Sequence, residues 1–127
     1  MEKTLLAIDD VNSILNIINH RLGDTYNVVK KSNGKEALEW LHEGNIPDVI
    51  IADLHMPEMD GFEFLKHIRA SGFFNEIPLM ILSSYENSTV RIQCLKSGAD
   101  DYMVKPFNPE ELEARIENIV KRTSKAA

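Results

Sequence analysis

Residues 48–54 read Asp-Val-Ile-Ile-Ala-Asp-Leu, and this stretch decides the fold class. Its centre, Val49–Ala52, is a continuous apolar run rich in β-branched residues, which at this length favours a strand over a helix. Because the run is continuous rather than alternating, we expect both faces of the strand to be buried, as in a parallel sheet covered by helices. The run ends at Asp53, so a carboxylate follows a rigid apolar strand.

The same kind of short run recurs along the chain. Apolar, β-branched or aromatic runs also span Leu5–Ile8, Tyr26–Val29, Leu79–Leu82 and Tyr102–Val104. The stretches between the runs, and the stretch after the fifth one, carry apolar residues at helical spacing. Strands that alternate with helices in this way predict a doubly wound α/β domain, with a five-stranded parallel sheet and helices on both faces.

Length and composition limit the function classes. The chain has 127 residues and no internal repeat, so we expect one domain spanning residues 1–127. A net charge of −6 argues against direct nucleic-acid binding, which needs clustered lysine and arginine. With no signal-peptide pattern and no apolar run near the roughly 18 residues of a membrane span, we expect a cytoplasmic protein without membrane contact. The single cysteine, Cys94, has no zinc-type spacing and is expected to fill the core.

Chemically active side chains gather where the predicted strands end. In open α/β sheets, ligands bind beyond the carboxyl ends of the strands. The first strand is followed by Asp9 and Asp10, the third by Asp53, the fourth by Ser83 and the fifth by Lys105. The second run ends in lysine and serine instead, as an edge strand far from a central site would.

The three predicted neighbours Asp9, Asp10 and Asp53 suggest a cation site. Carboxylates at one sheet edge repel each other, and a divalent cation would relieve that repulsion. All-oxygen ligation without a histidine or cysteine cluster favours Mg²⁺, whereas Ca²⁺ would need more protein ligands. For any single aspartate the alternative is an ordinary solvated loop. That alternative does not explain why acids, a hydroxyl and an ammonium occupy four strand ends that the fold brings together.

Asp53 is the candidate nucleophile. A carboxylate can attack phosphorus to give an acyl phosphate, and the apolar strand before Asp53 would hold it rigidly. Lys105 and the metal would neutralise the phosphoryl oxygens in the transition state, and Ser83 would donate a hydrogen bond to the product. The alternative for Ser83 is a helix cap, but Asn87 and Ser88 are better placed for that role.

With these residues, the sequence resembles a known family, the receiver domains of two-component response regulators. The resemblance covers nearly the whole chain. It is carried by Ala7–Asp10, Asp53–Gly61, Leu82–Ser84, Gly98–Tyr102 and Lys105–Phe107.

The resemblance implies a strand order of 2-1-3-4-5, known from flavodoxin-like folds of this family. It also implies that Asp53 accepts a phosphoryl group from a histidine kinase or phosphotransfer protein. Asp10 and Asp53 would bind Mg²⁺ directly, Asp9 through water, and His55 through its main-chain carbonyl. Such a domain would catalyse only its own phosphorylation and dephosphorylation.

The resemblance further implies a switch between Ser83 and Tyr102. Phosphorylation would draw the Ser83 hydroxyl inward, and the ring of Tyr102 would move into the vacated space; the alternative is a half-buried core tyrosine. Two positions that vary in the family, His55 and Tyr85, flank the path of an attacking water. We expect the His55 side chain to point to solvent.

Three other functions are weighed. An aspartate-nucleophile phosphatase would need a second carboxylate two residues after Asp53, where this chain has His55. A flavin-binding electron carrier would need a Ser/Thr/Gly-rich phosphate loop where this chain has Asp9 and Asp10. A degenerate receiver that only binds protein stays as the alternative, although all five site residues are retained.

A charged surface predicts self-association upon phosphorylation. Two copies related by a two-fold axis would pair Arg115 and Arg122 of one with Asp100 and Asp101 of the other. In the same contact, Arg91 would face Glu111 and Leu95 would pack on Ala114. The arrangement resembles receivers of winged-helix transcription factors, which dimerise through the fourth helix, fifth strand and fifth helix. The alternative is intrachain pairing on a solvated face.

Overall fold

The central strand of the sheet contains the apolar run Val49–Ala52, and it is buried along its whole length. The computed structural model describes residues 2–84 and 86–126. The strands are β1 (Lys3–Ile8), β2 (Tyr26–Lys31), β3 (Val49–Asp53), β4 (Leu79–Ser83) and β5 (Asp101–Val104). The helices are α1 (Asn12–Leu22), α2 (Gly34–His42), α3 (Gly61–Ala70), α4 (Ser88–Lys96) and α5 (Pro109–Ala126).

The strands are parallel and lie in the order β2-β1-β3-β4-β5, which confirms the predicted α/β sheet and its order. As predicted, β2 is an edge strand; β5 is the other edge. Each strand is longer than its apolar run, because main-chain pairing continues into polar residues. The ladder pairs Asp53 with Leu82 and Ser83 with Val104, so these two site residues are the last residues of their strands rather than the first after them.

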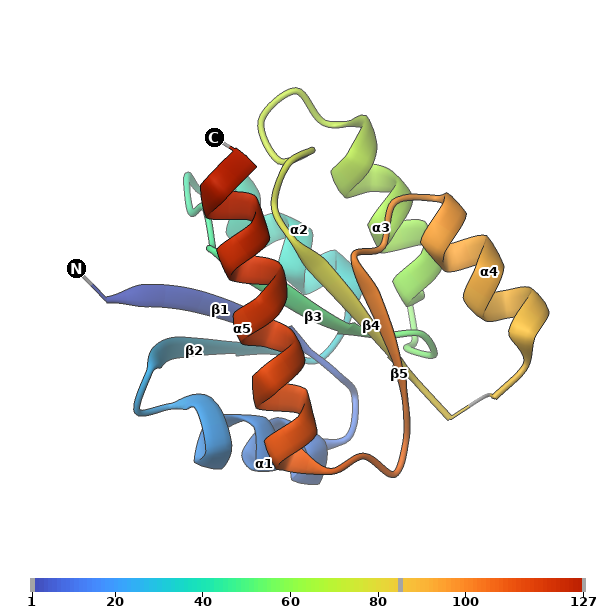
Figure 1. Cartoon of the computed structure of the whole chain (residues 1–127). Helices are drawn as coiled ribbons and strands as arrows, with labels where there is room; N and C mark the ends of the chain where they lie inside the picture. Colours follow the sequence, from blue (N-terminus) through green and yellow to red (C-terminus); the bar gives the residue numbers. More distant parts are fainter. Residues whose placement is uncertain (1, 85, 127) are drawn as a thin grey trace.

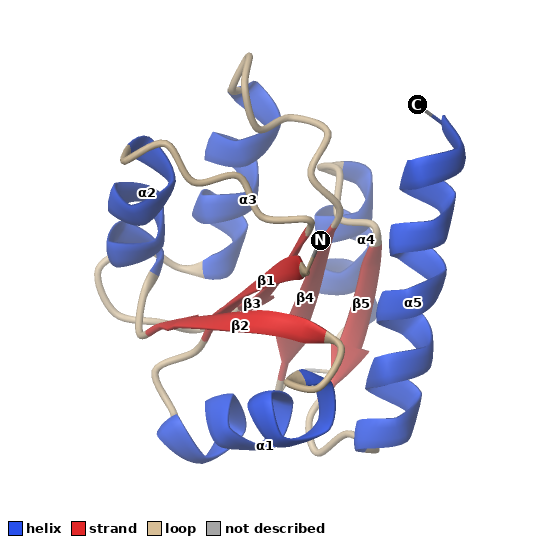
Figure 2. Cartoon of the chain, turned by 90° about the vertical axis from the view of Figure 1, so that its left-hand side faces the viewer, coloured by secondary structure: helices blue, strands red, loops and turns tan. Residues whose placement is uncertain are grey.

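Side chains of β3 alternate between two apolar layers. Ile50 and Ala52 join the cluster that α2, α3 and α4 cover, whereas Val49 and Ile51 join the one under α1 and α5. Figures 1 and 2 show these two groups of helices on opposite faces of the sheet. Cys94 is buried in the first cluster, which confirms its role as core filler. Among the described residues, no helix is both long and apolar enough to cross a membrane.

The turn between β3 and α3 is closed tightly against the strand. The N–H of Gly61 donates to the Leu54 carbonyl at 2.9 Å. A Cβ at Gly61 would lie 2.4 Å from the Asp53 carbonyl oxygen, so only glycine allows α3 to begin this close to the strand. Asp60 caps the helix by accepting a hydrogen bond from the Glu63 N–H.

The same turn holds a residue in a disfavoured backbone conformation. Glu58 has a φ of 71°, and the Met59 N–H donates across it to the Pro57 carbonyl at 2.8 Å. An i to i+2 hydrogen bond around a positive φ is the rare, strained form of the γ-turn. A side chain with a Cβ costs about 1–2 kcal/mol in the left-handed region, and glycine avoids that cost.

We therefore expect Glu58→Gly to raise the free energy of unfolding by about 1 kcal/mol. The matched control is Glu39→Gly, which puts the same substitution at an exposed position inside α2 and should lower stability by about 1 kcal/mol. Urea denaturation of both variants measures the two effects. A Glu58→Gly variant as destabilised as the control would contradict this account of the turn.

Candidate phosphoacceptor and metal site

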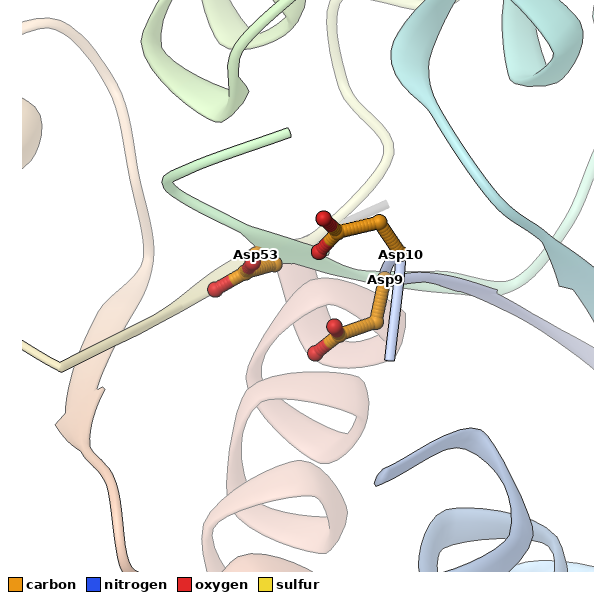
Figure 3. A group of neighbouring side chains, drawn as sticks. All are labelled: Asp9, Asp10 and Asp53. Carbon is orange, nitrogen blue, oxygen red and sulfur yellow. The ribbon is translucent and has the colours of Figure 1, made fainter. Parts of the chain in front are cut away.

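The predicted site residues meet at the carboxyl ends of the central strands. Asp9 and Asp10 directly follow β1, and Asp53 ends the neighbouring strand β3. One carboxylate oxygen from each of the three aspartates lies within 4.8 Å of the others, and Figure 3 shows the side chains grouped at this edge. The sheet topology thus brings together acids separated by more than 40 positions in the sequence.

Asp53 is a buried acid among other acids. Its residue is only 5% exposed. Burial raises the pKa of the Asp53 carboxyl, and the charges of Asp9 and Asp10 raise it further, while the ammonium of Lys105 opposes the rise. The net direction is upward, so the ionised form of Asp53 is held at a cost to the folded state.

Lys105 is the cation that this cluster already contains. Its Nζ donates to Asp9 Oδ2 at 2.8 Å and lies 3.0 Å from Asp53 Oδ1. Burial by itself would lower the pKa of the Lys105 ammonium, but the hydrogen bonds to the two carboxylates outweigh burial and raise it. Lys105 therefore stays protonated, and from its position directly after the edge strand β5 it bridges the ends of β1 and β3.

The backbone fixes Lys105 beside Ser83. The Lys105 N–H donates to the Ser83 carbonyl at 2.7 Å, which continues the pairing of β4 with β5. The Ser83 residue is fully buried. Both residues were predicted at strand ends, and the structure adds that their main chains are hydrogen-bonded to each other.

The three aspartates suit a small divalent cation held by oxygen. Octahedral Mg²⁺ holds its ligands at about 2.0–2.1 Å, so ligating oxygens lie about 3–4 Å apart, close to the observed grouping. Asp10 is exposed and available to an ion. Asp9 is buried, and its oxygens already accept hydrogen bonds from the Val11 N–H and from Lys105. This arrangement fits the predicted indirect role of Asp9.

The predictions for His55 and Tyr102, which neighbour the site, have different outcomes. The side chain of His55 is exposed, as expected, while its main-chain carbonyl as a metal ligand stays a prediction. Tyr102 is 6% exposed and packs in the cluster covered by α2, α3 and α4, so in this structure it is a buried rather than half-buried tyrosine. The switch between Ser83 and Tyr102 stays a prediction. Tyr85 lies outside the described residues.

Four charged residues of the predicted dimer surface are paired within the chain: Asp100, Asp101, Glu111 and Arg115. Arg115 contacts Asp101 at 3.0 Å and Glu111 at 3.1 Å. Asp100 instead contacts Arg69 of α3 at 2.9 Å. This intrachain pairing is the predicted alternative to a contact between two copies. A contact between two copies would have to exchange these partners.

One apolar member of that surface was not predicted from the sequence. Ile92 of α4 is 47% exposed, and Leu95, one helical turn further on, is 43% exposed. Arg91, Ala114 and Arg122 are also exposed. The i, i+3 spacing of Ile92 and Leu95 on one helix face was the signal that would have found the pair.

Comparisons with known proteins agree on one family. Residues 5–117 match the family model described as the response regulator receiver domain. The chain is 42% identical over 127 residues to a probable transcriptional regulator, ycf27, of Guillardia theta, covering 99% of this chain and 48% of that one. It is 36% identical over 128 residues to the alkaline phosphatase synthesis transcriptional regulatory protein PhoP of Bacillus subtilis, covering 100% and 52%.

A solved structure gives the same result. The chemotaxis response regulator CheY4 of Vibrio cholerae superposes with a TM-score of 0.86 at 34% identity, covering 94% of this chain and 99% of that one. The chain therefore spans about half the length of the two transcriptional regulators and nearly all of the chemotaxis protein.

The charge of Asp53 should destabilise the fold at neutral pH. We expect Asp53→Asn to melt a few degrees above the parent chain at pH 7, because the variant removes a buried charge repelled by two others. Since the folded pKa of Asp53 lies above its unfolded value near 3.8, the advantage is complete above the folded pKa. It is lost as the pH falls through the folded pKa, and is absent below 3.8.

Thermal unfolding at several pH values measures this difference. The control is Asp24→Asn, which neutralises an exposed acid and should leave the melting temperature nearly unchanged. An Asp53→Asn variant that melted at or below the parent temperature at pH 7 would show that the Lys105 contact outweighs burial and repulsion.

Proposed function

This chain belongs to the response regulator receiver family, and we propose that in the cytoplasm it accepts a phosphoryl group on Asp53 from a histidine kinase or a phosphotransfer protein. The observation that carries the proposal is the position of Asp53. It is buried at the end of β3, with Lys105 Nζ at 3.0 Å and the carboxylates of Asp9 and Asp10 beside it. A buried carboxylate with a fixed cation next to it is equipped for in-line attack on phosphorus.

The transfer requires ionised Asp53. One of its oxygens attacks the phosphorus of a phosphohistidine as the nitrogen–phosphorus bond breaks, and the electrons of that bond leave with the imidazole. Lys105 neutralises charge on the phosphoryl oxygens without moving far, because it is already bound to Asp53. The Ser83 hydroxyl donates a hydrogen bond to the product. The chain thereby catalyses only its own phosphorylation and dephosphorylation.

Mg²⁺ completes the site in this proposal. Asp10 and Asp53 would hold the ion directly, Asp9 would act through water, and the His55 carbonyl would be a further ligand. The bound ion supplies positive charge to the transferring phosphoryl group. The grouping of Asp9, Asp10 and Asp53 supports this part of the proposal, because three carboxylates beside the ammonium of Lys105 leave an excess of negative charge.

We expect the purified chain to gain the mass of one phosphoryl group when it is treated with a small phosphodonor and Mg²⁺, and to gain none when the metal is chelated. Asp53→Asn should gain none under any condition. Lys105→Met should keep the acceptor and react at least ten times more slowly, because one transition-state cation is lost.

Intact-mass spectrometry over time gives all three results. Asp60→Asn is the control, since it changes an acid that caps α3 outside the cluster. A phosphoryl gain by Asp53→Asn would disprove the assignment. An unreactive parent chain would instead favour the alternative function, a degenerate receiver that binds protein without phosphorylation.

We also propose an output surface on α4, β5 and α5. Ile92 and Leu95 give α4 an exposed apolar stripe, and the basic residues Arg91 and Lys96 stand beside it. The first turn of α5 is acidic, with Glu110 and Glu111. Basic and acidic elements on one surface allow a second copy to bind by two-fold symmetry. In this pairing Leu95 and Ile92 pack on Ala114, and Arg91 faces Glu111.

The resting dimer should be weak, because its charged residues would have to leave partners within their own chain. Arg115 already has Asp101 and Glu111, so a second copy gains little from replacing these contacts. Phosphorylation favours the dimer only through a conformer that binds the second copy better. Asp53 is coupled to this surface through Ser83, the last residue of β4, and through Tyr102, which lies in β5.

We expect a monomer in the resting state and a dimer with Mg²⁺ and beryllium fluoride, which mimics the phosphoryl group. Arg115→Glu should abolish the dimer, and Ser83→Ala or Tyr102→Ala should weaken its response to beryllium fluoride. Lys35→Glu, which reverses an exposed charge on α2, is the control. Sedimentation velocity measures each state; a dimer indifferent to Arg115→Glu would exclude this surface.

A further inference from the structure

Arg69 is a largely buried cation outside the phosphoacceptor site. It lies in the last turn of α3, and its side chain is only 19% exposed. Its Nε donates to the Gly98 carbonyl at 2.8 Å, and its Nη1 donates to the carbonyls of Asn75 at 3.1 Å and Ile77 at 2.7 Å. The Nη2 atom donates to Asp100 Oδ2 at 2.9 Å. One guanidinium thus ties together the end of α3 and the loops before β4 and β5.

The turn after α4 is shaped to receive this side chain. Gly98 has a φ of 111°, and a Cβ there would lie 2.9 Å from Arg69 Cγ, so glycine lets the two segments touch. Asp100 Oδ2 also accepts the Leu79 N–H at 2.8 Å, and the Asp100 N–H donates to the Leu79 carbonyl at 2.8 Å. The turn is therefore fixed to the sheet as well as to α3.

The two ends of α4 differ in how firmly they are held. At the C-terminal end, Cys94 and Ala99 are buried and the turn is bound by Arg69. At the N-terminal end, Asn87, Ser88 and Thr89 are exposed. A groove of about 300 Å³ lies along α4, from the N-cap residue Asn87 as far as Cys94. It is lined by Leu54, His55, Phe62, Asn87, Val90 and Cys94, among others.

The loosely held end is the one nearest the site. The loop from β4 to α4 begins directly after Ser83, and the groove is lined by Leu54 and His55, which follow Asp53. Arg69 lies at the opposite end of the strands, where β4 and β5 begin. Its partner Asp100 is hydrogen-bonded to Leu79, the first residue of β4. Figure 1 shows α4 spanning this distance along the side of the sheet.

We propose that Arg69 is a clamp that fixes the C-terminal end of α4, so that α4 responds to phosphorylation as a lever. Its N-terminal half moves over the groove, and the turn Ser97–Asp100 stays in place as the pivot. The lever motion rests on the proposed function, whereas the clamp itself exists in the resting chain. Arg69 is a positioning residue with no role in the chemistry at Asp53.

Hydrogen exchange of the full chain, read by mass spectrometry with and without Mg²⁺ and beryllium fluoride, tests the clamp. In the resting parent chain, we expect the amides of residues 98–101 to exchange far more slowly than those of residues 88–91. In the Arg115→Glu variant, which is expected to stay monomeric, beryllium fluoride should change exchange in residues 88–91 and leave residues 98–101 unchanged. In Arg69→Gln, exchange at residues 98–101 should rise at least about tenfold, because several charge-assisted hydrogen bonds are lost.

Phosphorylation of Asp53, measured by intact mass on the same samples, should be unaffected by Arg69→Gln. The matched control is Arg21→Gln, which removes an arginine of α1 that is paired with Glu113 of α5. This variant should keep the parental exchange pattern of α4. If Arg69→Gln does not fold, Asp100→Asn weakens the same clamp through one contact and should give a smaller rise at residues 98–101.

The outcomes separate the two proposals. A parent chain whose Asp53 gains no phosphoryl mass, but whose resting exchange contrast disappears in Arg69→Gln, would overturn the proposed function and keep the clamp. Equal exchange at the two ends of resting α4 would overturn the clamp. So would a beryllium fluoride response of Arg115→Glu at residues 98–101 as large as that at 88–91, or a resting exchange pattern in Arg69→Gln identical to that of the parent.

Discussion

The contact of one ammonium group with two carboxylates organises this molecule. Lys105 Nζ lies 2.8 Å from Asp9 and 3.0 Å from Asp53, and it is delivered there by an edge strand of only four residues. Without that cation, the ends of β1 and β3 would present only mutually repelling acids to a buried space. The main-chain hydrogen bond from Lys105 to Ser83 is therefore as important as the ion pair, because it fixes the backbone of Lys105 to β4 and so positions the ammonium group.

The site trades stability for reactivity. Burial that raises the pKa of Asp53 also removes competing water and strengthens each interaction with a transferring phosphoryl group. The β3–α3 turn shows the same trade, since Glu58 adopts a left-handed conformation three residues after His55, whose carbonyl is expected to bind the metal. In both places the rest of the fold, above all the fully buried strands β3 and β4, supplies the stability that the site gives up.

The sequence predicted most of the fold because the apolar runs are short, continuous and regularly spaced. The run Val49–Ala52 could be predicted as a strand buried on both faces from its residues alone, and the aspartates, Ser83 and Lys105 followed from the rule that strand ends meet. The charged surface could not be predicted in the same way. Arg69 and Asp100 are 31 positions apart, and Asp101 and Arg115 are 14 apart, so their pairing depends on how helices pack on the sheet. Arginines and acids on a helix face fix which charges are available, but tertiary packing decides whether they pair within one chain or between two.

The position of β2 at the edge of the sheet has a consequence for the behaviour of the protein at high concentration. An edge strand exposes unpaired main-chain donors and acceptors, which can recruit a strand from another molecule. Here β2 ends in Lys30 and Lys31, and the addition of a second β2 along this edge would bring their like charges together. This repulsion discourages amyloid-like growth from the free edge of the sheet, so the two lysines act as gatekeepers against aggregation.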